Sequence, residues 1–542
     1  MRKRNSLVTA AIIVGSLAIP QIAQASTPPQ YVIPVSAGAD ISVIATTGDY
    51  ISGQILRGTP DGMGALKNSD GTLTLLSNHE ITTTAAVQAA SGSTTSPWAS
   101  SVSRLTYDPK SNTFTKDENL IKNISFYNYA TRTWTNTPDQ SVPVGSPATN
   151  TYGDLMGGWG LSRFCSGNLV AAGGLSYTET VKGKKTTYGY TGAVYFTGEE
   201  DGDLSRSFAM DMNGNVIQLP SFGLFGVENW LTARNTGKST VVMGNEDNGA
   251  TTSQLYMYAG TKQATGANFA EKAGLTNGKL YTLAVENFLN DNAIRTAKKT
   301  REAVPVSFNE VNPDPRFGNF TNMSQANGTT FSRIEDGEWD PVNPNVYYFQ
   351  TTESNKDAAA TVADSNDPAG TTRDGGALWR LTFNDIKNPL LGGKLEMLLN
   401  GTEPLLLNKP DNLAVDEAGY IILQEDPGAN NHVSRVVAYR LSDGKMAVLA
   451  QFDPKYFVKD GTNFITIDEE TSGAINVNQF FKTAGDKKSY FFFNAQVHTP
   501  TVQASRPDIL ADAAEWKKIN DAGVEGGQYY KLVIDWTKVN FA

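Results

Sequence analysis

Acidic residues recur at one place in a repeated sequence pattern. An apolar, strand-like segment that ends in polar or acidic residues occurs six times, as LTLLSNHE (73–80), AVYFTGEED (193–201), TVVMGNED (240–247), NVYYFQTTE (345–353), YIILQED (420–426) and YFFFNAQVH (490–498). One polar residue opens the strand-like segment before each copy; in chain order these residues are Asp61, Cys165, Glu228, Glu335, Asp411 and Glu470. Carboxylates are ligands for Ca²⁺, Mg²⁺ or Mn²⁺, and a thiolate among them favours iron or zinc. The residue types therefore predict metal-ion chemistry.

The two polar ends of each pattern are expected to meet in space. In an antiparallel hairpin, the start of the first strand and the end of the second lie at the same end. Carboxylates gathered in this way repel one another, and some would have to be protonated. Bound multivalent cations remove that repulsion, so the pattern predicts a site for several metal ions. His79 would either bind metal or orient Glu80, and the residues leave both readings open.

The single cysteine takes part in this pattern. A lone Cys in a strand is often an inert buried residue. Cys165, however, stands where the other units have an acid, so we expect it to be a metal ligand.

Two arginines could hold an anionic substrate beside such metals. Arg333 precedes Glu335 by two residues, and Arg163 precedes Cys165 by two. Residues i and i+2 of a strand share a face, so each arginine could point towards the metals. The alternative is an ordinary salt bridge to a neighbouring carboxylate.

The elements that position these residues are short strands separated by turn residues. Six repeated units of this kind predict an all-β fold, a six-bladed β-propeller, whose inner strands bring the polar ends to one mouth. Residues 26–542 would form this single domain, with 261–330 as an insertion between blades. Amphipathic helices are few and short, at 268–273, 285–299 and 508–521. A β-sandwich is the alternative, but it does not explain why the acids fall on one side of every hairpin.

Residues 1–25 have the layout of a secretory signal peptide. Three basic residues precede an apolar run, and Ala23-Gln24-Ala25 predicts cleavage after Ala25. We therefore expect a secreted or periplasmic protein. One cysteine cannot form an internal disulfide, so core burial or bound ions must stabilise the exported chain.

The overall charge and missing motifs exclude several classes. The formal net charge is −10, without basic tracts, which argues against a nucleic-acid partner. No apolar stretch after the leader is long enough to span a bilayer, and we expect a monomer. The sequence has no Walker motif, no G-x-S-x-G elbow and no C-x-x-C.

The ordered motifs resemble those of PhoX-type alkaline phosphatases. They are S-N-H-E (77–80), C-S-G-N (165–168), T-G-E-E (197–200), G-L-F-G-V-E-N (223–229), M-G-N-E-D (243–247), R-I-E-D (333–336) and P-D-N-L (410–413). The resemblance implies an exported six-bladed propeller that hydrolyses small phosphate monoesters with calcium and iron ions. It implies that the metal ligands are Glu80, Cys165, Glu199, Glu200, Glu228, Glu335 and Asp411. Arg333 and Glu335 would be catalytic, and Arg333, Asn78 and Arg163 would bind the substrate.

The chain also departs from the family pattern. Gly198 stands where the family usually has a Cys, and the leader lacks the usual adjacent pair of arginines. Two other functions are therefore considered. One is a calcium-dependent propeller hydrolase of another class, such as a lactonase or a phosphodiesterase. The other is a non-enzymatic, calcium-stabilised binding propeller, for which a thiolate at Cys165 would have no use.

Overall fold

The fold is described for most of the chain. The computed structural model describes residues 28–81, 100–136, 161–203, 205–249, 252–317, 324–353, 374–505 and 512–541. The expected signal peptide, residues 1–25, lies outside these ranges.

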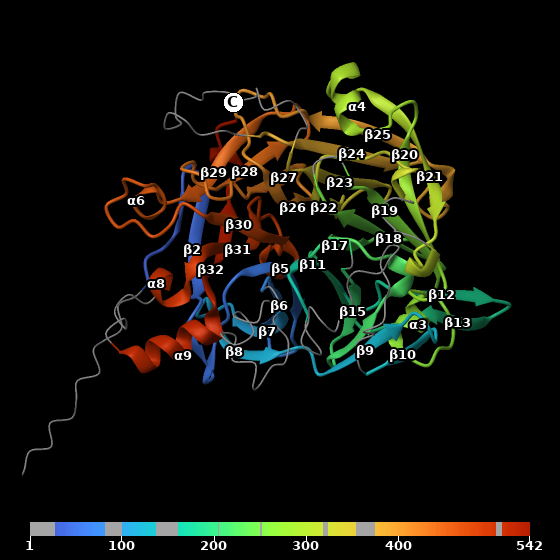
Figure 1. Cartoon of the computed structure of the whole chain (residues 1–542), viewed down its shortest axis with the longest axis horizontal. Helices are drawn as coiled ribbons and strands as arrows, with labels where there is room; N and C mark the ends of the chain where they lie inside the picture. The colour runs from blue at the N-terminus through green and yellow to red at the C-terminus, as the bar shows by residue number, and fades with distance from the viewer. Residues whose placement is uncertain are drawn as a thin grey trace, which may run out of the picture.

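Within the described residues, six antiparallel units follow one another along the chain (Figure 1). The inner strands are β5 (Pro60–Lys67), β11 (Phe164–Val170), β17 (Val227–Thr232), β22 (Ile334–Trp339), β26 (Pro410–Asp416) and β30 (Glu469–Asn476). Each pairs with the next strand of its unit: β6 (Leu73–His79), β14 (Val194–Glu199), β18 (Ser239–Glu246), β23 (Val346–Thr351), β27 (Tyr420–Glu425) and β31 (Ser489–Pro500). These second strands are the six repeated apolar segments of the sequence.

Two further strands complete each unit on its outer side. The third strands are β7 (Ser101–Asp108), β15 (Ser207–Asp211), β19 (Leu255–Thr261), β24 (Ala377–Phe383), β28 (Arg435–Arg440) and β32 (Glu525–Ile534). The fourth are β8 (Thr113–Asn119), β16 (Asn215–Gln218), β20 (Lys279–Val285), β25 (Gly393–Leu399), β29 (Met446–Phe452) and β2 (Ala39–Thr46). In the second unit, β9 (Asn123–Asn128) and β10 (Thr133–Thr135) extend the sheet beyond β16.

The units form a closed ring. Their inner strands lie next to one another in chain order, and β30 returns to contact β5. Among the described residues, six clusters of buried apolar side chains each join two neighbouring units, the last joining the sixth unit to the first. Burial between sheets is thus the main stabilising contribution to the ring. The predicted all-β, propeller-like fold is confirmed.

Segments from the N-terminal part close the ring. β2 pairs with β32 near the C-terminus, and β1 (Val32–Pro34) pairs with β29. Pairing between the two ends of the chain satisfies the backbone groups that an open sheet edge would expose.

The stretch 261–330 does more than separate two units. It supplies β20 and also β21 (Ala303–Val311), which pairs with both β20 and β25 and joins the third and fourth units into one sheet of nine strands. The expected helix at 285–299 is shorter, α4 (Asp291–Ala297), because Val285 still belongs to β20 and Asn290 caps the helix. The helix expected at 268–273 is α3 (Phe269–Ala273), capped by Asn268.

The remaining elements are small. In the described ranges, two hairpins stand outside the six units, β3 (Tyr50–Ile51) with β4 (Gln54–Ile55), and β12 (Ser176–Val181) with β13 (Lys184–Gly189). The other helices are α6 (Pro454–Phe457), α7 (Asn478–Phe481), α8 (Thr501–Ser505) and α9 (Ala513–Gly523), with 3-10 turns at Pro220–Phe222, Pro315–Phe317, Pro389–Leu391 and Trp536–Lys538. In the described part of the chain, no helix is long and apolar enough to cross a membrane.

Candidate metal centre

The inner strands share a local irregularity at the predicted ligands. In five units the pairing with the second strand shifts register just after the first paired residue, and the skipped positions include Asp61, Cys165, Glu228, Glu335 and Asp411. A β-bulge of this kind frees a residue from the ladder and redirects its side chain. The chain packs tightly here: a Cβ on Gly62 would lie 2.1 Å from the backbone nitrogen of Gly167, so glycine is required. The bulges explain how one residue per unit can turn towards the axis.

The redirected side chains form three linked groups of candidate ligands. Each group has its ligand atoms within 4.8 Å of one another, and the groups are Asp61–Glu80–Cys165, Cys165–Glu200–Glu228 and Glu228–Glu335–Asp411. Cys165 belongs to two groups, and so does Glu228. The three groups therefore form one continuous row, which suits several ions better than one.

Three of the buried carboxylates in this row have oxygens that accept no hydrogen bond within the described part of the chain. Both side-chain oxygens of Glu228, one of Glu335 and one of Asp411 are buried and have no hydrogen-bond partner among the described residues. Burial, followed by repulsion from neighbouring acids, raises the pKa values of Glu228 and Asp411 well above the ordinary range. Unpaired, converging oxygens are costly in a protein interior unless a cation binds them. The donor set therefore fits divalent or trivalent metal ions.

Asp61 is the ligand candidate that sequence reasoning left out of its ligand set. It is fully buried, and the thiol of Cys165 donates a hydrogen bond to its Oδ2 over 2.8 Å. Burial, with Glu80 nearby, raises the pKa of Asp61 to about 7. The repeat itself contains the signal, because Asp61 occupies the position that Cys165 and Glu228 occupy in later units.

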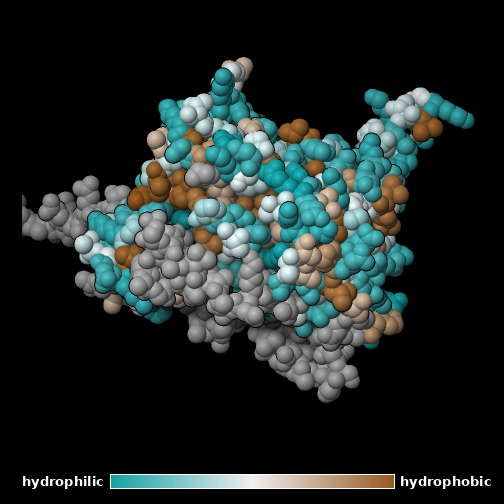
Figure 2. Space-filling view, turned by 90° about the horizontal axis from the view of Figure 1, so that it is seen from above, coloured by the Kyte–Doolittle hydropathy of each residue, from teal (hydrophilic) through white to brown (hydrophobic). Residues whose placement is uncertain are grey.

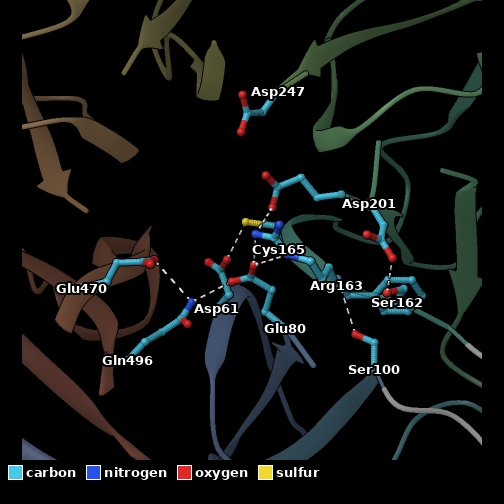
Figure 3. Close-up of polar contacts among 12 residues, drawn as sticks. Asp61, Glu80, Ser100, Ser162, Arg163, Cys165, Asp201, Asp247, Glu470 and Gln496 are labelled. Carbon is cyan, nitrogen blue, oxygen red and sulfur yellow. Dashed lines mark hydrogen bonds and ion pairs between the residues drawn. The ribbon is translucent and has the colours of Figure 1, made fainter. Parts of the chain in front are cut away.

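Arg163 lies between two of the groups. Its guanidinium contacts Glu80 at 2.6 Å and Glu200 at 3.0 Å, and 38% of its side chain is exposed. Figure 3 shows this side chain beside the sulfur of Cys165, with the carboxylates of Asp61 and Glu80 below them in the view. The salt bridges considered from sequence are therefore present, and they lie at the candidate metal centre; binding of an anionic substrate by Arg163 stays a prediction.

Arg333 has the equivalent place in the fourth unit. It donates to both oxygens of Asp247, at 2.9 and 2.6 Å, and lies 3.3 Å from Glu335. Both arginines have left-handed backbone angles, with φ of 58° for Arg333 and 40° for Arg163. Such angles cost energy for residues other than glycine, and they persist where the surrounding structure fixes them. Asp247 is a second contributor that sequence reasoning did not assign to the site.

Comparison with known proteins gives this geometry a family. The sequence model of the alkaline phosphatase PhoX family matches residues 209–483, just over half of the chain. The chain belongs to this family. Its members are metal-dependent phosphoric monoester hydrolases, and the chain is therefore a metal-dependent phosphatase. No curated protein matches the sequence significantly.

A solved structure from the same family shares this fold. The structure of Pseudomonas fluorescens PhoX in complex with vanadate, a transition state analogue, matches with a TM-score of 0.59 at 12% identity, over 94% of this chain and 97% of that chain. TolB from Acinetobacter baumannii matches over 82% of this chain and 78% of its own at 9% identity, with a TM-score of 0.23. That second likeness is too weak to support an argument. The first shows that the PhoX fold extends over nearly the whole chain.

Two residues expected at the PhoX site have other partners. Glu199 accepts hydrogen bonds from Arg206 and from the backbone of Ser162, and it belongs to none of the three groups. Asn78 is fully buried; its amide nitrogen donates to the carbonyls of Cys165 and Ser166 and to Thr197. Glu199 therefore faces away from the candidate ligands, and Asn78 fixes the backbone around Cys165 rather than facing a substrate.

The other histidine and acid candidates also have structural partners. His79 is fully buried between the carbonyl of Gly58 and the hydroxyl of Ser103, and burial lowers its pKa to about 3. In the sixth unit the register shift falls later, between Ser472 and Ile475, so Glu470 remains paired with Gln496. Glu470 accordingly stays outside the three groups (Figure 3).

Proposed function

We propose that this PhoX-family chain is an exported enzyme that hydrolyses small phosphate monoesters at a cluster of calcium and iron ions. One observation supports the proposal above all others. Glu228, Glu335 and Asp411 lie in one group, and each has a buried oxygen that accepts no hydrogen bond from the described residues; Arg333 lies against Glu335. A row of metal ligands beside a fixed cation suits a phosphate dianion, which needs positive charge on several sides.

The proposed ligand set follows the geometry. It consists of Asp61, Glu80, Cys165, Glu200, Glu228, Glu335 and Asp411, and it leaves out Glu199. Hard carboxylate oxygens suit calcium, whereas the single thiolate favours iron at the groups that share Cys165. A thiol must lose its proton to bind metal, so metal binding would reverse the present state, in which burial and nearby acids raise the pKa of Cys165.

The protein's own residues bind and orient the substrate. Arg333 would donate to the phosphoryl oxygens while Asp247 holds its guanidinium in a fixed plane. Arg163 would face the same anion from the neighbouring groups, with Glu80 and Glu200 limiting its motion. When bound, the metal ions would supply Lewis-acid stabilisation of the charge that develops on the phosphoryl group. The burial of the ligand row excludes bulk water, which strengthens each of these interactions.

Metal analysis combined with p-nitrophenyl phosphate turnover tests the proposal. We compare wild type, Cys165→Ala and Arg333→Ala, with Arg380→Ala as a matched arginine control, because Arg380 pairs with Glu396 on outer strands. Wild type is expected to carry both metals and be active. Cys165→Ala should lose iron, Arg333→Ala should keep its metals and lose activity, and Arg380→Ala should match wild type.

Other outcomes would overturn parts of the proposal. Metal-loaded wild type without phosphatase activity would exclude the monoesterase function, and full activity in Cys165→Ala would exclude the thiolate ligand. Parallel assays with a phosphodiester and a lactone test the two other hydrolase classes. Cleavage of the chain before Ser26 upon expression with an export pathway would support export.

A further inference from the structure

The β12–β13 hairpin projects from the body of the protein. It is a separate two-stranded sheet inserted between β11 and β14 (Figure 1). Its strands are joined by Lys182 and Gly183, with φ of 50° and 78°, which is the two-residue turn that matches the twist of a hairpin. All residues from 180 to 185 are exposed. Figure 2 shows a largely hydrophilic arm on this side of the molecule.

The base of the hairpin is fixed to the third unit. Glu179 forms a salt bridge of 2.7 Å with Lys238, whose ammonium group also lies 4.3 Å from the ring centre of Tyr188. The backbone nitrogen of Gly189 donates to the carbonyl of Gln263 over 2.8 Å. The tip is therefore presented at a defined place and does not fold back on the surface.

The tip carries concentrated positive charge on an acidic protein. Lys182, Lys184 and Lys185 lie within four consecutive residues, in a chain whose formal net charge is −10. Within the described residues, no carboxylate forms an ion pair with any of the three. Val181, paired directly with Lys184, is 57% exposed. An exposed aliphatic side chain beside unpaired lysines is the combination that binds the interface of an anionic bilayer.

We propose that the tip of the β12–β13 hairpin docks on a membrane surface rich in anionic lipids. The topology gives the resulting orientation. The hairpin leaves the blade at the turn between β11 and β14, whereas Cys165 and Glu200 lie at the opposite ends of these strands. A protein docked by this tip would hold its metal centre away from the lipid, open to soluble phosphate esters. The docking itself does not depend on the proposed reaction.

Sedimentation with lipid vesicles tests the proposal. The full-length mature protein is mixed with vesicles of phosphatidylglycerol and phosphatidylcholine in equal parts, and separately with pure phosphatidylcholine, at low and at high salt. The variant K182Q/K184Q/K185Q is compared with K459Q/K487Q/K488Q, which removes the same charge from exposed lysines elsewhere. We expect wild type and the control variant to bind the anionic vesicles only, and to be released by salt.

The tip variant should bind the anionic vesicles on the order of 100-fold more weakly, from the electrostatic contribution of three lysines near the surface. Its phosphatase activity and melting temperature should equal those of wild type, because the tip lies far from the ligand row. Equal binding by both triple variants would overturn the proposal. Equal binding of wild type to neutral and to anionic vesicles would also overturn it. So would binding of wild type to immobilised DNA without binding to vesicles.

Discussion

Buried acids occur in two neighbouring layers at the mouth of the ring, and the two layers have different electrostatics. Glu228, Glu335 and Asp411 lie at the bulges of the inner strands and have oxygens that accept no hydrogen bond from the described residues. Glu199 and Glu425, at the ends of the second strands, have their oxygens occupied. Both layers consist of carboxylates with 9% or less exposure, so burial alone does not distinguish a ligand from a structural residue.

We call the acids at the bulges the metal layer and the acids at the ends of the second strands the structural layer. In the structural layer, Glu199 and Glu425 are held by the same arrangement of donors in two units. Arg206 donates from its side chain and backbone to Glu199, and Arg435 does the same to Glu425. A backbone nitrogen from the segment before the inner strand, of Ser162 or of Asn408, completes each set. Burial acts to raise the pKa of Glu425, but Arg435 outweighs it and lowers that pKa to about 2. In this layer a fixed guanidinium neutralises the buried carboxylate, whereas in the other layer bound metal ions would do so.

The largest predicted effect is a loss of phosphatase activity when the metal layer is disrupted. Chelation of the metals, or the substitution Glu335→Gln, should reduce phosphatase activity at least about 1,000-fold, because the stabilisation of the transition state by metal would be lost. In chelated protein, Glu335→Gln should leave the free energy of unfolding unchanged or raise it. Burial and the nearby Asp247 raise the pKa of Glu335, so keeping this carboxyl in the folded protein costs free energy at neutral pH that Gln avoids. Turnover of p-nitrophenyl phosphate and urea unfolding measure the two effects. A marked loss of stability in the chelated variant would contradict the separation of the layers.

The second prediction applies to the structural layer. Arg206→Met should reduce the free energy of unfolding by about 3–5 kcal/mol, because Glu199 would remain buried without its cation. Arg435→Met should behave in the same way through Glu425. Urea unfolding measures both, and the exposed pair of Arg440 with Asp443 provides a control, Arg440→Met, with an expected loss of about 1 kcal/mol or less. If Arg206→Met changed the free energy of unfolding only slightly and the variant lost bound metal, Glu199 would belong to the metal layer instead.

The sequence was sufficient to predict the repeat, because each unit has its own apolar second strand and its own polar opening residue. It was not sufficient to separate the layers. Glu199 and Glu200 are adjacent, and successive side chains of a strand point to opposite faces, so an error of one position exchanges a structural acid for a ligand. The bulges set that position, and they depend on contacts between units, such as the approach of Gly62 to Gly167. Such contacts between distant segments leave no local signal in the sequence.

The third prediction uses an acid of the structural layer whose partners are neutral. Glu246 is fully buried and accepts hydrogen bonds from Tyr256 and the backbone of Gln254, and burial raises its pKa to about 8. The folded state then keeps the proton up to about pH 8, whereas the unfolded chain releases it near its ordinary pKa of 4.5. Glu246 should therefore contribute stability at low pH that decreases as the pH rises from 4.5 to 8, by on the order of 5 kcal/mol.

Urea unfolding of wild type and Glu246→Gln across this pH range measures that contribution. The difference in unfolding free energy between the two proteins should change with pH, to the disadvantage of wild type at high pH. At Glu425, where Arg435 keeps the pKa low, the same comparison with Glu425→Gln should show no change between pH 4.5 and 8. A flat difference at Glu246 would indicate that a cation compensates this acid as well.

The smallest predicted effect separates support of the metal layer from contact with the substrate. Asn78→Ala should reduce the free energy of unfolding by about 1–3 kcal/mol, because the carbonyls of Cys165 and Ser166 would lose their buried donor. The KM for p-nitrophenyl phosphate should stay unchanged, since Asn78 is fully buried and its amide nitrogen donates only within the fold. The exposed Asn384 provides the control Asn384→Ala, for which we expect little change in either quantity. A raised KM at unchanged stability would instead place Asn78 at the substrate, and the supporting network behind Cys165 would then have to be reassigned.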